Sequence, residues 1–226
     1  MTRIPPAEWA PQRALFLGFP SDGSLWEQDL APAQAEVAAL ARQLAQTVPV
    51  LLLASDADAA TTARLLAPSA SVHQVPFGDI WLRDTGPIFT GPESCARFRF
   101  NGWGGKYDLA HDDTVGAEMA GLMSAAVDEH PTILEGGAIE YDGQGLLLTT
   151  EQCLLNPNRN PGWTREAAEQ GLSKALGTRR IVWLGDGLLN DHTDGHVDNL
   201  ARFVAPGTVA LPVAADASDP NAAVFA

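Results

Sequence analysis

The residues best suited to chemistry lie in the nine-residue stretch 191–199, which reads DHTDGHVDN. This stretch contains three carboxylates and two imidazoles. If its last part is extended, His196 and Asp198 point the same way, because alternate residues of a strand share a face. An imidazole beside a carboxylate can transfer protons or bind a cation, so the stretch predicts one of these two uses.

Ionisable residues also precede each of three predicted β-hairpins. The hairpin over residues 87–100 follows Asp84, the one over 138–150 follows Glu135, and the one over 200–213 follows His196 and Asp198; their turns are Gly91-Pro92, Asp142-Gly143 and Pro206-Gly207. A spacing of about 50 to 60 residues suits a repeated supersecondary unit. Units arranged around an axis would bring the four ionisable side chains together at its centre. Alternatively, these are three ordinary hairpins with charged residues at strand ends.

The elements that must position these residues alternate between strands and amphipathic helices, as in an α/β protein. The pattern predicts strands at 14–19, 50–54, 72–75 and 181–184, and helices at 32–47, 56–66, 114–127 and 166–176. Asp56 is expected to cap the second helix, and Gly177 to end the last one in the left-handed conformation.

Converging Asp, Asp, Glu and His side chains suit a cationic substrate. Two ionised carboxylates only accept hydrogen bonds, so together they match a planar donor such as a guanidinium. A third carboxylate can hold a histidine in one tautomer and keep it basic. Attack on the guanidinium carbon would then require a nucleophile, for which a thiolate is well suited.

Composition limits the class of protein. The chain has 226 residues, 46% of them hydrophobic and 19% charged, as expected of a folded domain. Its net charge of −14 argues against nucleic acid or an anionic membrane as a partner and favours a cationic small molecule. No secretory signal is visible at residues 1–9, and the longest apolar run, 48–54, is too short to cross a bilayer. We therefore expect a cytoplasmic protein.

Five segments together resemble the agmatine deiminase and bacterial (Porphyromonas-type) peptidylarginine deiminase family. They occur in family order, within a resemblance that runs from about Trp9 to residues 219–221: DIWLRDTGP (79–87), NGWGG (101–105), LEGG (134–137), LTTEQCLLN with NRNP (148–156, 158–161) and DGHVDN (194–199). The resemblance implies a pentein-type αβ propeller with five-fold pseudo-symmetry, here incomplete at about three to three and a half units. It also implies a single deiminase domain over residues 1–226 that needs no cofactor and no metal.

The resemblance further implies roles for individual residues. Asp84 and Asp198 would clamp the guanidinium, and His196 would act as general acid and base. Glu135 would support the histidine and contact the substrate. Trp103 would line the pocket and pack on the aliphatic arm of the substrate.

The family's nucleophilic cysteine has no counterpart in the sequence. The family carries it in a glycine-rich segment near the C-terminus, whereas the cysteines here are Cys95, beside a turn, and Cys153, in the TTEQCLL segment. We expect Cys153 to be a buried strand cysteine rather than the nucleophile. A propeller lacking units would leave apolar faces and strand edges uncovered. We therefore expect the chain to be one piece of a longer protein, or to be completed by a second polypeptide or by self-association.

The function implied is hydrolysis of agmatine to N-carbamoylputrescine and ammonia, a step of putrescine biosynthesis, through a cysteine thiouronium intermediate in the complete protein. Deimination of peptidyl-arginine to citrulline is the alternative within the family. Outside it, the chain could bind a guanidino ligand without turnover, or be an inactive fragment. A divalent metal site is a chemical alternative, with these candidate ligands: His192, Asp194, His196 and Asp198.

Structural roles compete for several other residues. Arg83 and Arg159 are predicted ion-pair partners, and His192 a turn residue. Trp81 and Trp103 suit either the core or a pocket wall. Gly136-Gly137 can serve a close backbone approach or a bulge.

Overall fold

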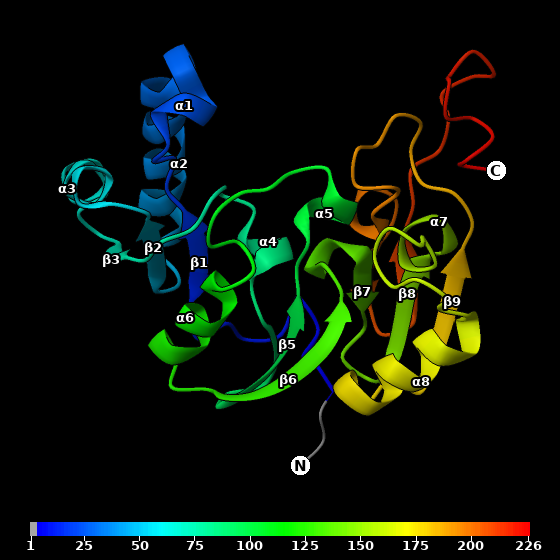
Figure 1. Ribbon diagram of the computed structural model, residues 1–226. Helices are drawn as coiled ribbons and strands as arrows, with labels where there is room; N and C mark the ends of the chain where they lie inside the picture. Colours follow the sequence, from blue (N-terminus) through cyan, green and yellow to red (C-terminus); the bar gives the residue numbers. More distant parts are fainter. Residues whose placement is uncertain (1–3) are drawn as a thin grey trace.

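The N-terminal sheet is parallel and packs against two alanine-rich helices. The computed structural model describes residues 4–226. Strands β1 (Leu15–Gly18), β2 (Val50–Ala54) and β3 (Ser71–Gln74) pair in the order β1-β2-β3. After α1 (Gly23–Trp26) and η1 (Glu27–Asp29), helices α2 (Leu30–Leu44) and α3 (Ala57–Leu66) cross over between the strands. Figure 1 shows these helices beside the sheet, at the left edge of the molecule. Their buried alanines allow close approach to β2; they are Ala38, Ala41, Ala59, Ala60 and Ala63.

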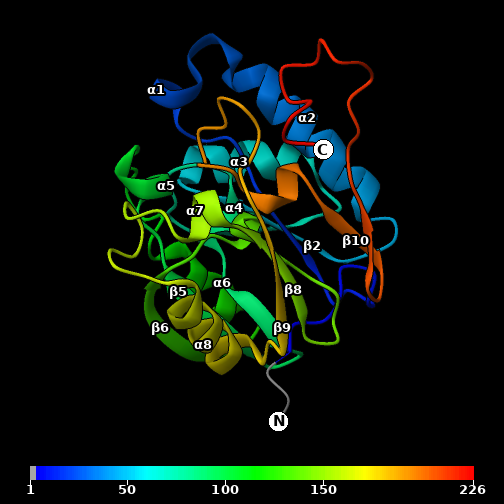
Figure 2. The ribbon, with the colours of Figure 1, turned by 90° about the vertical axis from the view of Figure 1, so that its right-hand side faces the viewer.

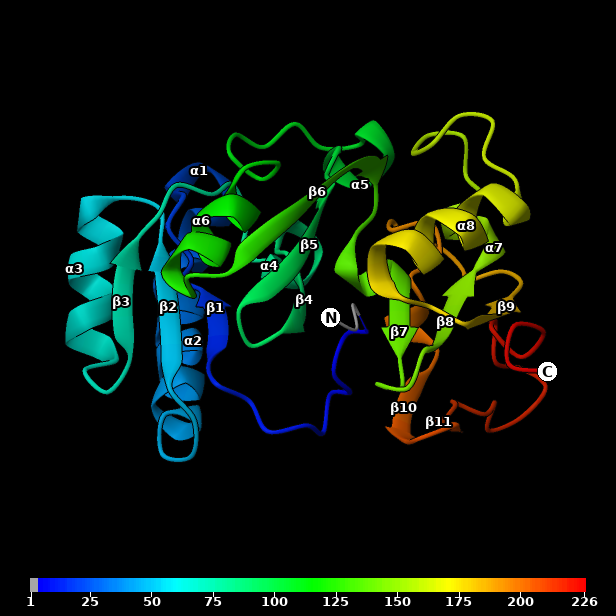
Figure 3. The ribbon, with the colours of Figure 1, turned by 90° about the horizontal axis from the view of Figure 1, so that it is seen from below.

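The next two sheets share one plan, which is an antiparallel hairpin followed by a helix and a parallel strand. Strands β4 (Ile88–Gly91), β5 (Ser94–Arg99) and β6 (Ala126–Ile133) form one, and β7 (Ile139–Tyr141), β8 (Leu146–Thr150) and β9 (Arg180–Leu184) the other. The chain between hairpin and parallel strand contains α5 (Gly102–Gly105) and α6 (Val115–Leu122), or α7 (Glu151–Leu154) and α8 (Arg165–Leu176). A further hairpin, β10 (Arg202–Ala205) with β11 (Thr208–Ala210), begins the plan again. The sheets follow one another across Figure 3.

A single helical turn precedes each hairpin. These turns are α4 (Leu82–Thr85), η2 (Gly136–Ala138) and η3 (Val197–Asn199). α4 contacts η2, and η2 contacts η3. The two longest helices, α2 and α8, lie at the outside of the molecule in Figures 1 and 2. The repeat predicted from the sequence therefore brings together the chain segments that carry the candidate residues.

Local signals in the sequence predicted most elements. The three hairpins occur at the predicted turns, and strand β2 has the predicted bounds. Asp56 caps α3 by accepting a hydrogen bond from the Ala59 amide at 2.8 Å, and Gly177 ends α8 with φ of 63°. Among the described residues no helix is long and apolar enough to cross a membrane.

The predicted helix over 114–127 is wrong in its last part. Helix α6 ends at Leu122, Ser124 has a φ of +53°, and strand β6 begins at Ala126. The strand contains charged residues and Pro131, so its sequence lacks the alternation of apolar and polar residues that predicts a strand. It tolerates a proline because it is the edge strand of the order β4-β5-β6.

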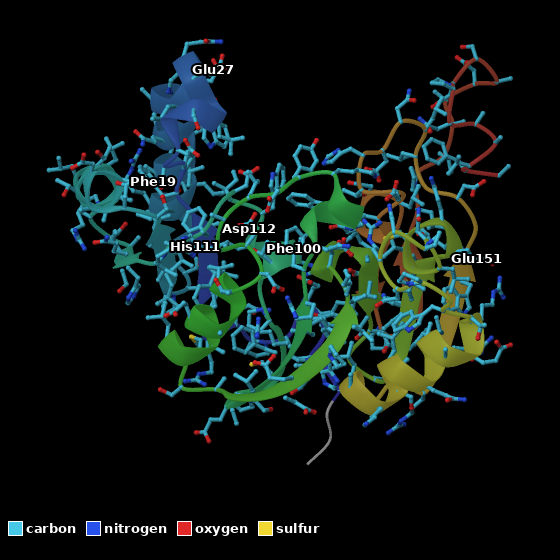
Figure 4. All side chains as sticks on the ribbon, in the orientation of Figure 1. Phe19, Glu27, Phe100, His111, Asp112 and Glu151 are labelled. Atoms are coloured by element: carbon cyan, nitrogen blue, oxygen red, sulfur yellow. The ribbon has the colours of Figure 1, made fainter. Side chains whose placement is uncertain are left out.

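A buried carboxylate, Asp112, holds the segment that leads into α4. Its Oδ1 accepts hydrogen bonds from the amides of Gly78 at 2.8 Å and Asp79 at 3.3 Å, whereas its Oδ2 has no hydrogen-bond partner among the described residues. Figure 4 shows Asp112 next to His111, in the chain between α5 and α6. Burial raises the pKa of Asp112 to about 6, against the opposing effect of the two amide hydrogen bonds.

This raised pKa predicts a pH-dependent stability. A carboxyl group whose pKa is higher in the folded state than in the unfolded state stabilises the fold while it is protonated. Its contribution to the free energy of unfolding therefore falls as the pH rises from its unfolded-state pKa through about 6. Between pH 5 and pH 7 we expect Asp112 to lower the free energy of unfolding by about 1 kcal/mol. Asp112→Asn should remove this difference in urea unfolding. An unchanged difference would show that Asp112 does not titrate in this range.

Candidate active site

Asp84 lies in the one-turn helix α4 with both carboxylate oxygens fixed. Its Oδ1 accepts a hydrogen bond from the Gly137 amide at 2.8 Å, and its Oδ2 accepts one from the Trp103 indole Nε1 at 2.9 Å. The side chain is only 10% exposed. Each carboxylate oxygen can accept more than one hydrogen bond. The two donors therefore orient Asp84 and leave it able to accept hydrogen bonds from a ligand.

Trp103 lies behind Asp84 in a left-handed turn. The φ angles of Gly102, Trp103, Gly104 and Gly105 are all positive, and that of Trp103 is 54°. Only glycine adopts this conformation without cost, which explains the glycines on both sides of a bulky residue. The indole is buried and makes edge contacts with Phe100 and Tyr107, at 4.9 and 5.6 Å between ring centroids. Trp103 thus fixes Asp84, whereas its contact with a substrate arm stays a prediction. Trp81 is neither core nor buried, being exposed at the start of α4.

His196 and Asp198 face Asp84 from the turn η3. The His196 Nδ1 lies 3.8 Å from the Asp84 Oδ1 and 4.0 Å from the Asp198 Oδ1. His196 is buried, and its Nε2 has no hydrogen-bond partner among residues 4–226. Burial raises the pKa of Asp198, an effect that His196 opposes and the Asp84 carboxylate reinforces. The extended conformation considered for residues 196–198 is wrong, because η3 is a 3₁₀ turn; the two side chains nevertheless meet.

Gly137 occupies the point where these three side chains converge. A Cβ atom at this position would lie 2.6 Å from the His196 Nδ1, 2.7 Å from the Asp84 Oδ1 and 2.8 Å from the Asp198 Oδ2. The predicted close backbone approach at Gly136-Gly137 is therefore confirmed. Because glycine has no side chain, two carboxylates and an imidazole can lie close together against its backbone.

Glu135 is completely buried and forms an ion pair with Arg159. The Arg159 Nε donates to both Glu135 oxygens, at 2.8 and 3.0 Å, while its terminal nitrogens donate to the Asp194 carboxylate at 2.7 Å and the Thr193 carbonyl at 2.7 Å. The prediction of Arg159 as an ion-pair partner is confirmed. Sequence reasoning missed its second partner, Asp194, although that residue lies in the stretch first singled out.

Cys153 lies close to the site and is buried, as expected, but it belongs to the one-turn helix α7 and not to a strand. A Glu135 carboxylate oxygen, the Cys153 Sγ and a ring nitrogen of His196 all lie within 4.8 Å of one another. Burial raises the pKa of Cys153, so its thiol is neutral at ordinary pH. Among the described residues this is the one group spaced for a metal ion, and it differs from the set with His192, Asp194 and Asp198 considered above. Arg159 already neutralises Glu135, which disfavours a further cation there.

A second cluster of charged side chains lies next to the site. It includes Arg83, the other arginine that we predicted to form an ion pair. Arg83 binds Glu8 at 2.5 Å and lies 3.7 Å from the buried carboxylate of Glu140, which Arg202 approaches to 3.4 Å. Glu140 also accepts a hydrogen bond from the Phe203 amide at 3.0 Å. This group joins β7 to β10 and to the residue before Asp84. His192 is in a turn, as predicted, with its ring against Trp103 and Tyr107.

Comparison with known proteins identifies the family. The family model of Porphyromonas-type peptidyl-arginine deiminase matches residues 4–226, the whole described chain. The chain belongs to this family. The deiminase resemblance found in the sequence is therefore confirmed, on a mixed α/β fold.

Individual deiminases show how far the similarity extends. The chain is 43% identical to an agmatine deiminase of Stutzerimonas stutzeri over 96% of its own length and 62% of that protein. It is 41% identical to an agmatine deiminase of Pseudomonas syringae, over 96% of this chain and 62% of that protein. The solved agmatine deiminase of Enterococcus faecalis superposes with a TM-score of 0.91 at 31% identity, over 98% of this chain and 64% of the other. The chain thus spans about 62% of the length of these curated relatives.

Proposed function

We propose that this chain provides the guanidinium-binding and acid–base residues of an agmatine deiminase. The observation that carries the proposal is the convergence of Asp84, Asp198 and His196 at Gly137. Among residues 4–226 neither aspartate forms an ion pair with a lysine or arginine, so the two carboxylates lie side by side without such a partner. A guanidinium supplies the missing positive charge and a planar set of donors. The similarity to agmatine deiminases supports agmatine as the source of that group.

In the proposed reaction each of these side chains has its own role. Asp84 and Asp198 accept hydrogen bonds from the guanidinium nitrogens and hold its carbon for attack by a thiolate. The C–S bond forms as a C–N bond breaks, and His196 gives a proton to the departing ammonia. His196 then takes a proton from water, which attacks the same carbon and releases the thiolate and N-carbamoylputrescine. Glu135, fixed by Arg159, stabilises the imidazolium.

In our proposal, the attacking thiolate is not one of the two cysteines in this sequence. Burial of Cys153 and its raised pKa argue against its use as a nucleophile. We further propose that the repeated units belong to a five-unit propeller. Its support is that the turns α4 and η3 both contact η2, so that the three turns before the hairpins carry one group of converging side chains.

Agmatine binding measured by isothermal titration calorimetry tests the proposal. Asp84→Asn and Asp198→Asn should each weaken binding by about 30-fold or more, because each removes one charge of a desolvated pair. Asp186→Asn, an exposed aspartate, is the matched control and should bind like the wild type. N-carbamoylputrescine lacks the positive guanidinium and should bind far more weakly. Equal agmatine affinity in all variants would overturn the proposal, and tighter binding of a peptidyl-arginine would favour the other family substrate.

A further inference from the structure

Asp194 joins three loops that surround the candidate site. Its Oδ1 accepts a hydrogen bond from the Lys106 Nζ at 2.5 Å. Its Oδ2 accepts from the Asn158 side-chain amide at 2.9 Å and from Arg159 at 2.7 Å. These charge-assisted hydrogen bonds outweigh the effect of burial and lower the pKa of Asp194 to about 2. We refer to Lys106, Asn158, Arg159 and Asp194 as the Asp194 junction.

One arm of the junction leads to Glu135. One edge of the Arg159 guanidinium donates to Glu135, and its two terminal nitrogens donate to Asp194 and to the Thr193 carbonyl. Each of the three nitrogens of this planar fork therefore donates a hydrogen bond. The fork must lie in one plane to reach all these acceptors. Loss of the Asp194 carboxylate would free one end of the guanidinium to turn, and the direction of the Glu135 carboxylate would no longer be fixed.

The other arm leads to Trp103 and Asp84. Lys106 directly follows the left-handed turn Gly102–Gly105, and its Nζ also donates to the His192 carbonyl at 2.5 Å. Asn158 packs beneath that turn, since a Cβ on Gly104 would lie 2.2 Å from its side-chain nitrogen. A bulky residue with positive φ persists only where its surroundings hold it. The junction therefore secures the turn that presents the Trp103 indole to Asp84.

The charges of the two arms alternate and cancel. In order, Glu135 is negative, Arg159 positive, Asp194 negative and Lys106 positive. Next to this neutral row, Asp84 and Asp198 are the carboxylates left for a cationic ligand. The row thus leaves no net charge beside the two aspartates that would draw the ligand away from them.

We propose that Asp194 is a positioning residue that sets Glu135 and the Trp103–Asp84 pair relative to each other. This rests on the proposed guanidinium site. Asp194 has a φ of +63°, which asparagine tolerates well, so Asp194→Asn tests its charge without straining the backbone. Both carboxylate oxygens face donors, and the NH₂ group of asparagine must therefore turn toward one of them.

Calorimetry provides the first readout. Asp194→Asn should weaken agmatine binding by about tenfold or more while the protein still unfolds cooperatively. Asp186→Asn, on the same loop but exposed, should bind agmatine like the wild type. Wild-type affinity in Asp194→Asn would overturn the proposal.

Nuclear magnetic resonance separates positioning from a general loss of stability. The Trp103 indole N–H and the Arg159 Nε–H are the two probes, assigned with Trp103→Phe and Arg159→Lys. Asp194→Asn should shift both signals, Lys106→Met only the indole signal, and Asp186→Asn neither. If Asp194→Asn does not fold, Lys106→Met decides, and an unmoved indole signal in that variant contradicts the proposal. If wild-type protein binds no agmatine, the proposed function fails, whereas these signals still test the junction.

Discussion

Replacement of Gly137 with alanine is expected to reduce agmatine binding by at least about 100-fold. The added methyl group would lie within 2.8 Å of the Asp84, His196 and Asp198 side chains and would push apart the groups that we assign to guanidinium binding. Gly137 has no positive φ, so alanine can adopt its backbone conformation. All three neighbours are ends of side chains, which can move apart. A lost hydrogen bond to a charged group costs about 1.5–3 kcal/mol, so the loss of two of them would weaken agmatine binding by about 100-fold or more.

The fold should survive this change, which makes the result interpretable. Overpacking at one buried position costs about 1–3 kcal/mol, measurable by urea unfolding. Gly121→Ala is a suitable control, because it adds the same methyl group to α6 where no atom lies within 4 Å. Calorimetric titration with agmatine compares the two variants. Wild-type affinity in Gly137→Ala would show that the guanidinium does not bind to these three side chains.

The sequence contained enough information to locate four of the converging side chains. Each of Asp84, Glu135 and His196 precedes a hairpin whose turn residues and strand pattern are local signals. Once such a repeat is detected, it predicts that equivalent positions of the units lie close together, even when no long-range contact is known. The family resemblance then pointed to the same residues, and the structure brings them together.

The remaining parts of the site depend on contacts that no local pattern encodes. Asp194 meets Lys106 across 88 positions of the chain and Arg159 across 35, through irregular loops. Strand β6 is stabilised by pairing with β5 rather than by its own alternation. The left-handed turn at Trp103 did leave a signal, because three glycines surround one tryptophan. Its consequence, the indole hydrogen bond to Asp84, requires the tertiary structure.

Replacement of Arg159 with methionine is expected to destabilise the fold by about 3–5 kcal/mol. The side chains of Arg159 and Glu135 are 1% and 0% exposed, so the change leaves a buried carboxylate without its partner. The hydrogen bonds to Asp194 and to the Thr193 carbonyl are lost as well. Urea unfolding of the variant and the wild type at the same pH measures the effect.

A double variant separates the buried charge from the lost packing. Adding Glu135→Gln to Arg159→Met removes the unpaired charge, and we expect it to recover about 2 kcal/mol or more of the stability. Arg165→Met is the control, since its pair with Glu151 is exposed and should cost at most about 1 kcal/mol. If Arg159→Met costs no more than Arg165→Met, Glu135 does not depend on Arg159. The buried pair would then be a consequence of the fold around the site rather than one of the interactions that hold it.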